Sequence, residues 1–158
     1  MKNKMKELKD KIINLGVARG YLPEFFEDNG DKQFITQYLR LLKEIGEAAD
    51  EIRAGNKEAF EMELGDCLVL LTNLDYIVDV VGCRSAYSSY FEDVESSVNN
   101  LMCVAEHTFD TRYFDNTVAE ERCLKLAYNK ISRRDGVLIN GDFFKKGDRE
   151  YIEYFKNK

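Results

Sequence analysis

Residues 37–66 read QYLRLLKEIGEAADEIRAGNKEAFEMELGD. Apolar residues recur every three or four positions on both sides of Gly55-Asn56, and this period predicts two amphipathic helices, over 32–54 and 57–81. Glycine followed by asparagine is a typical helix break. Because so short a connection makes consecutive helices antiparallel neighbours, the stretch predicts a helical hairpin as the centre of the fold.

The remainder of the chain is also predicted to be mostly helical. Further helices are expected over about 3–15, ending near Gly16, over 85–107, where the pattern is weaker, and over about 117–134. After Asp135-Gly136 the pattern changes to a short hairpin or an ordered loop around Asn140-Gly141. A last helical turn or two is expected over 149–155, with Asp148 as its cap. We therefore expect an all-α antiparallel bundle of about five helices with a short C-terminal hairpin or loop.

Composition limits the classes of function. The chain has 158 residues and one proline, and 23 basic against 29 acidic side chains give a net charge of −6. A single domain of this length can bury a core, and the acidic balance argues against nucleic-acid polymers and anionic membranes as partners. The most apolar run, 67–74, is too short to span a membrane, and the basic N-terminus lacks the apolar stretch of a secretory signal. Four widely spaced cysteines without a C-x-x-C pair favour a reduced, cytoplasmic protein.

The most informative chemistry lies in two pairs of acidic residues, Glu44/Glu47 and Glu63/Asp66. The i,i+3 spacing places both members of each pair on one helix face. Glu63 also falls within the apolar stripe of its helix, where an unpaired carboxylate is costly to bury. Four carboxylates that converge between antiparallel helices would have raised pKa values or would require cations. Oxygen ligands without His or Cys suit a hard divalent ion such as Mg²⁺.

Other interpretations of the acidic pairs exist. Such pairs are common on solvated helix faces, so the residues alone leave a cation site and a solvated surface both open. A ferritin-like di-iron bundle needs Glu-x-x-His pairs, and the single histidine, His107, follows Val104 at that spacing. A zinc site has equally little support, because one histidine and scattered cysteines do not supply its usual ligands.

Two blocks of the sequence resemble the MazG-like family of all-α NTP pyrophosphatases. The first is Glu44-Ile-Gly-Glu47 followed by Glu63-Leu-Gly-Asp66, which is similar to the family's E-x-x-E, spacer, E-x-x-D pattern and includes the upstream Gln37. The second, over 123–145, is similar to the C-terminal segment of short members, with its N-K-I, Arg-x-Gly and N-G-x-F-x-K elements. The resemblance covers about 32–81 and 122–148, roughly half of the chain.

The resemblance implies an activity, a cofactor and a set of site residues. The activity would be Mg²⁺-dependent hydrolysis of a nucleoside triphosphate to the monophosphate and pyrophosphate, with Mn²⁺ as a substitute ion. The metal ligands would be Glu44, Glu47, Glu63 and Asp66, one of which, unassigned, would act as general base. The substrate-binding residues would be Gln37, Asn129, Lys130, Arg134 and Lys145. Family members commonly form dimers or tetramers, so a homodimer or homotetramer is expected.

The sequence departs from the family pattern in two places. Lys43 stands where many relatives carry another Glu, and residues 82–121 form an insert or elaboration of what we expect to be a single domain over 1–158. These departures leave open a catalytically inactive helical module of the same fold that binds a nucleotide or a partner. A general helical interaction protein, whose acidic pairs are coincidental, is a third interpretation.

Overall fold

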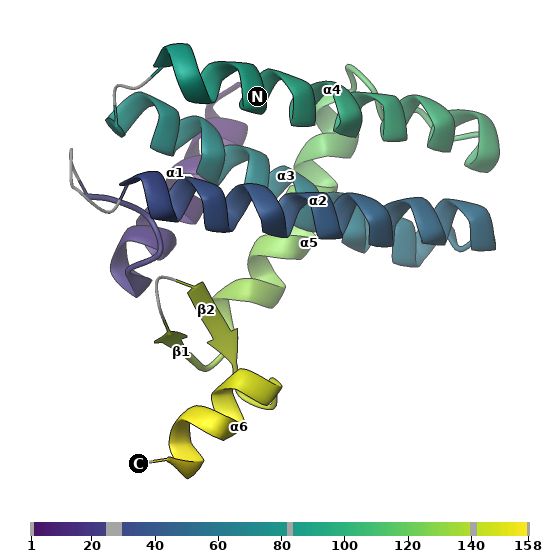
Figure 1. Cartoon of the computed structure of the whole chain (residues 1–158). Coiled ribbons are helices and arrows are strands. Elements are labelled where there is room, and N and C mark those ends of the chain that lie inside the picture. Colours follow the sequence, from purple (N-terminus) through teal and green to yellow (C-terminus); the bar gives the residue numbers. More distant parts are fainter. Residues whose placement is uncertain (1, 25–29, 82–83, 140–141, 158) are drawn as a thin grey trace.

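The computed structural model describes residues 2–24, 30–81, 84–139 and 142–157, which form six helices and one two-stranded sheet. In chain order these elements are α1 (Lys2–Arg19), α2 (Gly30–Ala54), α3 (Lys57–Val81), α4 (Arg84–Phe109), α5 (Thr117–Ser132), β1 (Gly136–Ile139), β2 (Asp142–Lys145) and α6 (Arg149–Lys156). The predicted all-α bundle is confirmed, and the short hairpin near the C-terminus is present (Figure 1).

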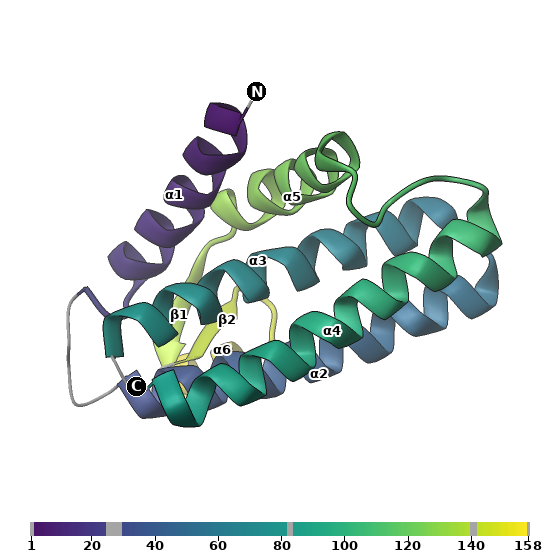
Figure 2. The ribbon, with the colours of Figure 1, turned by 90° about the horizontal axis from the view of Figure 1, so that it is seen from above.

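Helices α2 and α3 form the predicted antiparallel hairpin, with the predicted break between them (Figures 1 and 2). Gly55 ends α2 with a φ of +73°, a conformation that glycine adopts without steric cost. The Asn56 side chain then accepts a hydrogen bond from the Ala59 amide (3.2 Å) and caps α3. Leu41 and Leu64, one from each helix, are fully buried in the core that joins them.

Helix α4 lies along α2 and α3 and completes the core on one side of the pair (Figure 2). Its inward residues are buried at helical spacing: Val94, Val98, Met102 and Ala105. The chain then returns through residues 110–116, where the buried Tyr113 donates a hydrogen bond to Glu61 on α3 (2.8 Å). The segment that the sequence marked as an insert therefore supplies a helix that is part of the main core.

Helix α1 extends further than predicted. It passes through Gly16 to Arg19, so the expected end near Gly16 was wrong. Gly16 is buried, and a Cβ atom there would lie 2.4 Å from Leu22 Cδ1, so this glycine permits close packing rather than ending the helix. The helix ends at Arg19, and Gly20, which follows it, has a φ of +87°.

Helix α5 crosses α3 on the side opposite to α4 and leads into the hairpin (Figure 2). Asn116 caps its start by accepting hydrogen bonds from the Val118 and Ala119 amides, and the helix ends two residues earlier than expected. In the hairpin Ile139 pairs with Asp142, and the predicted turn residues, 140–141, lie outside the described part of the chain.

Helix α6 projects from the body and packs on β2 (Figure 1). Asp148 occupies the predicted N-cap position, but its carboxylate accepts a hydrogen bond from the Lys145 amide (2.9 Å) instead of capping the helix. None of the helices within the described ranges combines the length and the apolar character that a membrane crossing needs.

Candidate active site

Helices α2 and α3 bring three of the four predicted carboxylates together. One carboxylate oxygen from each of Glu44, Glu63 and Asp66 lies within 4.8 Å of the other two. The fourth, Glu47, lines the same cavity but stands at its edge, where its carboxylate lies 4.0 Å from the ammonium group of Lys43. Both members of that pair are substantially exposed, so their attraction is weak.

The three clustered carboxylates are short of hydrogen-bond partners. Glu44 Oε2, Glu63 Oε2 and Asp66 Oδ1 are buried and have no partner among the described residues. Burial is the main cause that raises the pKa of Glu44 to about 8, and the hydrogen bond with Glu63 and the charges of Asp66 and Glu47 add to it. Burial also raises the pKa of Glu63, although its hydrogen bond with Glu44 and the charge of Lys130 oppose the change. The cluster therefore holds more protons near neutral pH than separate carboxyl groups would.

The buried thiol next to the cluster, that of Cys67, is unreactive. Cys67 is fully buried, and burial together with the neighbouring carboxylates raises its pKa far above the ordinary value. A thiol that stays protonated is a poor nucleophile and a poor metal ligand, so Cys67 contributes packing rather than reactivity.

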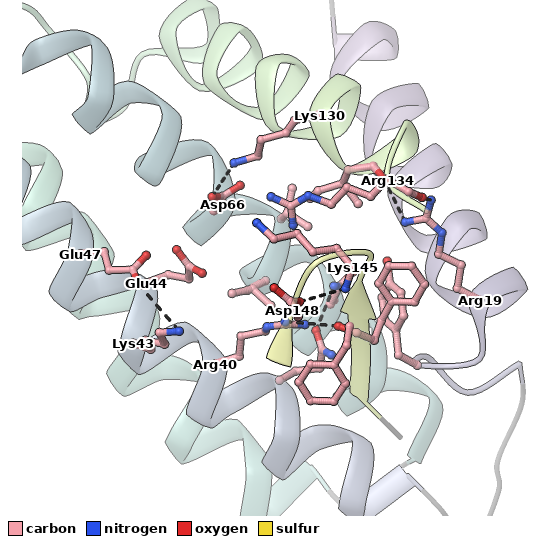
Figure 3. A pocket seen from close by; sticks show the side chains of 18 of the residues that line it. Arg19, Arg40, Lys43, Glu44, Glu47, Asp66, Lys130, Arg134, Lys145 and Asp148 are labelled. Atoms are coloured by element: carbon pink, nitrogen blue, oxygen red, sulfur yellow. Dashed lines mark hydrogen bonds and ion pairs between the residues drawn. The ribbon is translucent and has the colours of Figure 1, made fainter. Parts of the chain in front are cut away.

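Cationic side chains face the carboxylates across a cavity of about 430 Å³ (Figure 3). Lys130 on α5 reaches Asp66 Oδ2 at 2.8 Å and is the direct link between the two sides. Arg134 follows the C-terminal end of α5 and Lys145 lies on β2; both line the cavity beside it, and Arg40 lines it from α2. An acidic wall on the helical hairpin and a basic wall built mainly from α5 and the β-hairpin thus enclose one space.

Arg19, at the end of α1, holds the basic wall together. Its guanidinium donates hydrogen bonds to the carbonyls of Ile131 (3.0 Å) and Arg134 (2.9 Å). It also lies over the Phe143 ring, 4.7 Å from the ring centroid. One side chain therefore connects α1 with the C-terminal end of α5 and with β2 (Figure 3).

The predicted substrate-binding residues fall into two groups. Lys130, Arg134, Lys145 and the buried Gln37 line the cavity. Asn129 is exposed and is not among the residues that line it, because it lies on another face of α5.

The cavity lining also includes residues that the sequence did not indicate as site residues, among them Arg19, Arg40 and Asn73. Arg19 acts on partners more than a hundred residues away, which no local pattern reveals. Asn73 did carry a signal, because it follows Asp66 by seven residues and so shares its helix face.

One comparison with known protein families gave a match, and it covers the α2–α3 hairpin. Residues 32–80, about a third of the chain, match the family model described as the MazG nucleotide pyrophosphohydrolase domain. The resemblance to the MazG-like family is thereby confirmed over the segment that carries all four acidic residues. Neither the curated proteins nor the solved structures gave a match to this chain.

Proposed function

We propose that the protein is a Mg²⁺-dependent pyrophosphohydrolase that converts a nucleoside triphosphate, ribo- or deoxyribo-, into the monophosphate and pyrophosphate. The observation that carries this proposal is the cluster of Glu44, Glu63 and Asp66 facing cationic side chains across one cavity. The family match of residues 32–80 supports a nucleotide as the substrate. We expect the protein to act in the cytoplasm and to accept Mn²⁺ as a substitute ion.

The carboxylates fit a divalent cation. Glu44 Oε2, Glu63 Oε2 and Asp66 Oδ1 are buried acceptors that find no partner in the described part of the chain, and a hard cation coordinated by oxygen would satisfy them. Glu44, Glu63 and Asp66 would hold the ion, and Glu47 at the cavity edge would be a fourth ligand. When bound, Mg²⁺ would neutralise polyphosphate charge and lower the pKa of a water molecule.

The protein's own side chains supply the remaining functions. Arg134 and Lys145 line the cavity opposite the carboxylates and would bind phosphate oxygens through charged hydrogen bonds. Lys130 would do so from its position beside Asp66. One of the four acidic residues, unassigned, would act as general base and accept the proton of the attacking water.

The test is an assay for pyrophosphate release from a panel of ribo- and deoxyribonucleoside triphosphates, common and base-modified, with Mg²⁺ or Mn²⁺. We expect turnover of at least one substrate and none with chelator present. Glu63→Gln should remove the activity while the helical circular dichroism is unchanged. Glu58→Gln is the matched control, because Glu58 is exposed in the first turn of the same helix.

One observation favours a second candidate, a nucleotide- or partner-binding module without turnover. Lys130 and Lys43 already pair with Asp66 and Glu47, so two of the four carboxylates have cationic neighbours. Nucleotide binding without pyrophosphate release across the whole panel would establish this candidate. If Glu63→Gln kept the wild-type rate, the catalytic site would lie elsewhere.

Self-association into a homodimer or homotetramer is part of the proposal. Helix α2 exposes three large apolar side chains at heptad-like spacing, namely Ile35, Leu39 and Leu42, which are 52%, 57% and 44% exposed. Such a row is costly to leave in water and suits a helix of a second copy. Light scattering on the purified protein tests it, and Leu39→Glu should shift the mass toward the monomer.

A further inference from the structure

Besides the carboxylate cluster, the cavity contains a pair of hydrogen-bonded amide side chains, Gln37 and Asn73, called the amide pair below. Gln37 on α2 and Asn73 on α3 are each 2% exposed, and both line the cavity. Asn73 Nδ2 donates a hydrogen bond to Gln37 Oε1 at 3.1 Å. This bond uses the Asn73 donor and the Gln37 acceptor, and it leaves Asn73 Oδ1 buried without a partner among the described residues. A buried acceptor without a partner is costly, and a ligand that donates to it would remove that cost.

The amide pair and the carboxylates are separated by the same number of residues on both helices. Gln37 precedes Glu44 by seven residues on α2, and Asn73 follows Asp66 by seven on α3. Because the two helices are antiparallel, both offsets lead in the same direction, and seven residues correspond to roughly 10 Å along a helix. Leu70 lines the cavity between the amide pair and the carboxylates on α3. A nucleotide with its phosphates at the carboxylates would extend its nucleoside toward the amides.

The cavity lining also contains aromatic side chains. Tyr21 and Phe143 both line it, and their ring centroids are 6.2 Å apart. Arg40 donates to the Phe143 carbonyl at 3.3 Å, and Arg19 lies over the Phe143 ring, so the hairpin is tied in place here. Neutral amides beside aromatic rings suit a flat heteroaromatic group, whereas phosphate oxygens need the cations of the opposite wall.

We propose that Asn73 and Gln37 recognise the nucleobase of the substrate. Asn73 Oδ1 accepts a hydrogen bond from a ring or amino N–H of the base, and Gln37 Nε2 donates to the ring nitrogen or carbonyl oxygen beside that N–H. Asn73 is thus a specificity-determining residue. The pairing edge of each common base presents a donor next to an acceptor, so the amide pair would require a nucleobase and select against nucleotides in which that edge is blocked or absent. This inference rests on the proposed function, because it assumes that the phosphates occupy the carboxylate end.

Equilibrium binding tests the inference independently of turnover. The ligands are α,β-imido nucleoside triphosphates with Mg²⁺, together with a ribose triphosphate that lacks a base, measured by titration calorimetry on the wild-type protein. For the base that binds most tightly, methylation of the N–H group on its pairing edge should weaken affinity by about 10- to 100-fold. A methyl group away from that edge is the matched control and should change affinity by less than about threefold.

Asn73→Leu supplies the protein-side test. This nearly isosteric change removes the acceptor, so affinity for the preferred nucleotide should fall by about 10- to 100-fold, whereas affinity for the baseless triphosphate should not change. Asn100→Leu, at an exposed position of α4, is the control. An equal loss for both ligands would show that Asn73 only supports the fold and would overturn the proposal. If Asn73→Leu does not fold, the methylated ligands decide alone.

The two proposals fail in different ways. Absence of pyrophosphate release, with base-dependent binding retained, overturns the hydrolase but not the recognition by Asn73. The opposite result is also possible. If the protein releases pyrophosphate but binds methylated, unmethylated and baseless triphosphates with equal affinity, base recognition is overturned and the hydrolase is not.

Discussion

The two walls of the cavity are built in opposite ways. The acidic wall stands on two helices of 25 residues each, α2 and α3, joined by a two-residue connection and packed through fully buried side chains. The basic wall is assembled from the end of α1, the end of α5 and a hairpin whose strands have four residues each. A few polar contacts hold it, chiefly those of Arg19 and Arg40.

Because of this difference, the acidic wall should be rigid and the basic wall should move more easily. Carboxylates that repel one another need a framework that cannot relax, and a long helical pair buried on one side supplies it. The basic wall has less apolar burial behind it, and helix α6 beyond it has no buried residue. Segments with few buried contacts open at low free-energy cost, so we expect substrate entry to displace the basic wall rather than the acidic one.

The largest expected effect is at the acidic wall. Asp66→Asn removes a charge from the cluster and the partner of Lys130, and we expect metal-dependent activity to fall by at least about 100-fold. Pyrophosphate release measures the change, and circular dichroism checks the helices. Asp50→Asn, on the exposed face of α2, is the control. Activity within a factor of two of wild type would contradict the assignment of this wall.

The glycines of the two acidic motifs offer a sharper comparison. A Cβ atom at Gly65 would lie 2.3 Å from the Cys123 carbonyl oxygen on α5, whereas a Cβ atom at Gly46 would meet nothing within 4 Å. Gly65→Ala should therefore push the walls apart and lower the free energy of unfolding by about 2–3 kcal/mol. Gly46→Ala should raise it by about 0.5–1 kcal/mol through helix propensity. Urea denaturation measures both, and changes of the same sign would refute the packing argument.

A smaller effect is expected for Arg19, whose side chain joins the segments of the basic wall. Arg19→Ala leaves the Ile131 and Arg134 carbonyls without this partner and uncovers the Phe143 ring. After allowance for partial exposure, the free energy of unfolding should fall by about 1–2 kcal/mol. The Michaelis constant should rise, because Arg134 and the hairpin lose their positioning. Hydrogen exchange should accelerate over 131–134 with Arg19→Ala and not with the exposed control Arg53→Ala.

The smallest effect concerns pH in the metal-free protein. The folded state raises the pKa of Glu44 from its ordinary 4.5 to about 8, so the folded protein binds the proton more tightly than the unfolded chain. This contribution to stability is complete below about pH 4.5 and is lost as the pH rises through 8. Glu44→Gln lacks this titration, so relative to it, after allowance for the partial exposure of Glu44, the melting temperature of the wild type should drop by about 2–5 °C between pH 5 and 9. Parallel pH profiles would contradict the raised pKa.

The sequence predicted the acidic wall well because its signals are local. The break at Gly55-Asn56 and the helix over 57–81 follow from periodicity and from one pair of breakers, and α3 has those bounds. The i,i+3 carboxylates then needed only an antiparallel partner helix to converge, and Glu44, Glu63 and Asp66 do so. Glu47 was placed beside them by the same spacing, but it lies nearer the solvent.

The basic wall could not be predicted in the same way, because its contacts are between distant segments. A glycine such as Gly16 is a common helix end in a sequence, and only the packing of Leu22 against it shows why a glycine is needed inside the helix. The role of Arg19 exists only once α5 and β2 are in place. The family motif indicated Lys130 and Arg134, which line the cavity, and it also indicated Asn129, which is exposed and is not among the lining residues.

The two-residue connection between α2 and α3 also bears on how the chain folds. Contacts between segments close in sequence form fastest, because little loop entropy is lost. The α2–α3 hairpin should therefore assemble before α5 arrives, and its carboxylates must meet before Lys130 is there to neutralise Asp66. Protons shared within the cluster would relieve that early repulsion. Refolding of the metal-free chain should accordingly be faster at mildly acidic pH than at alkaline pH.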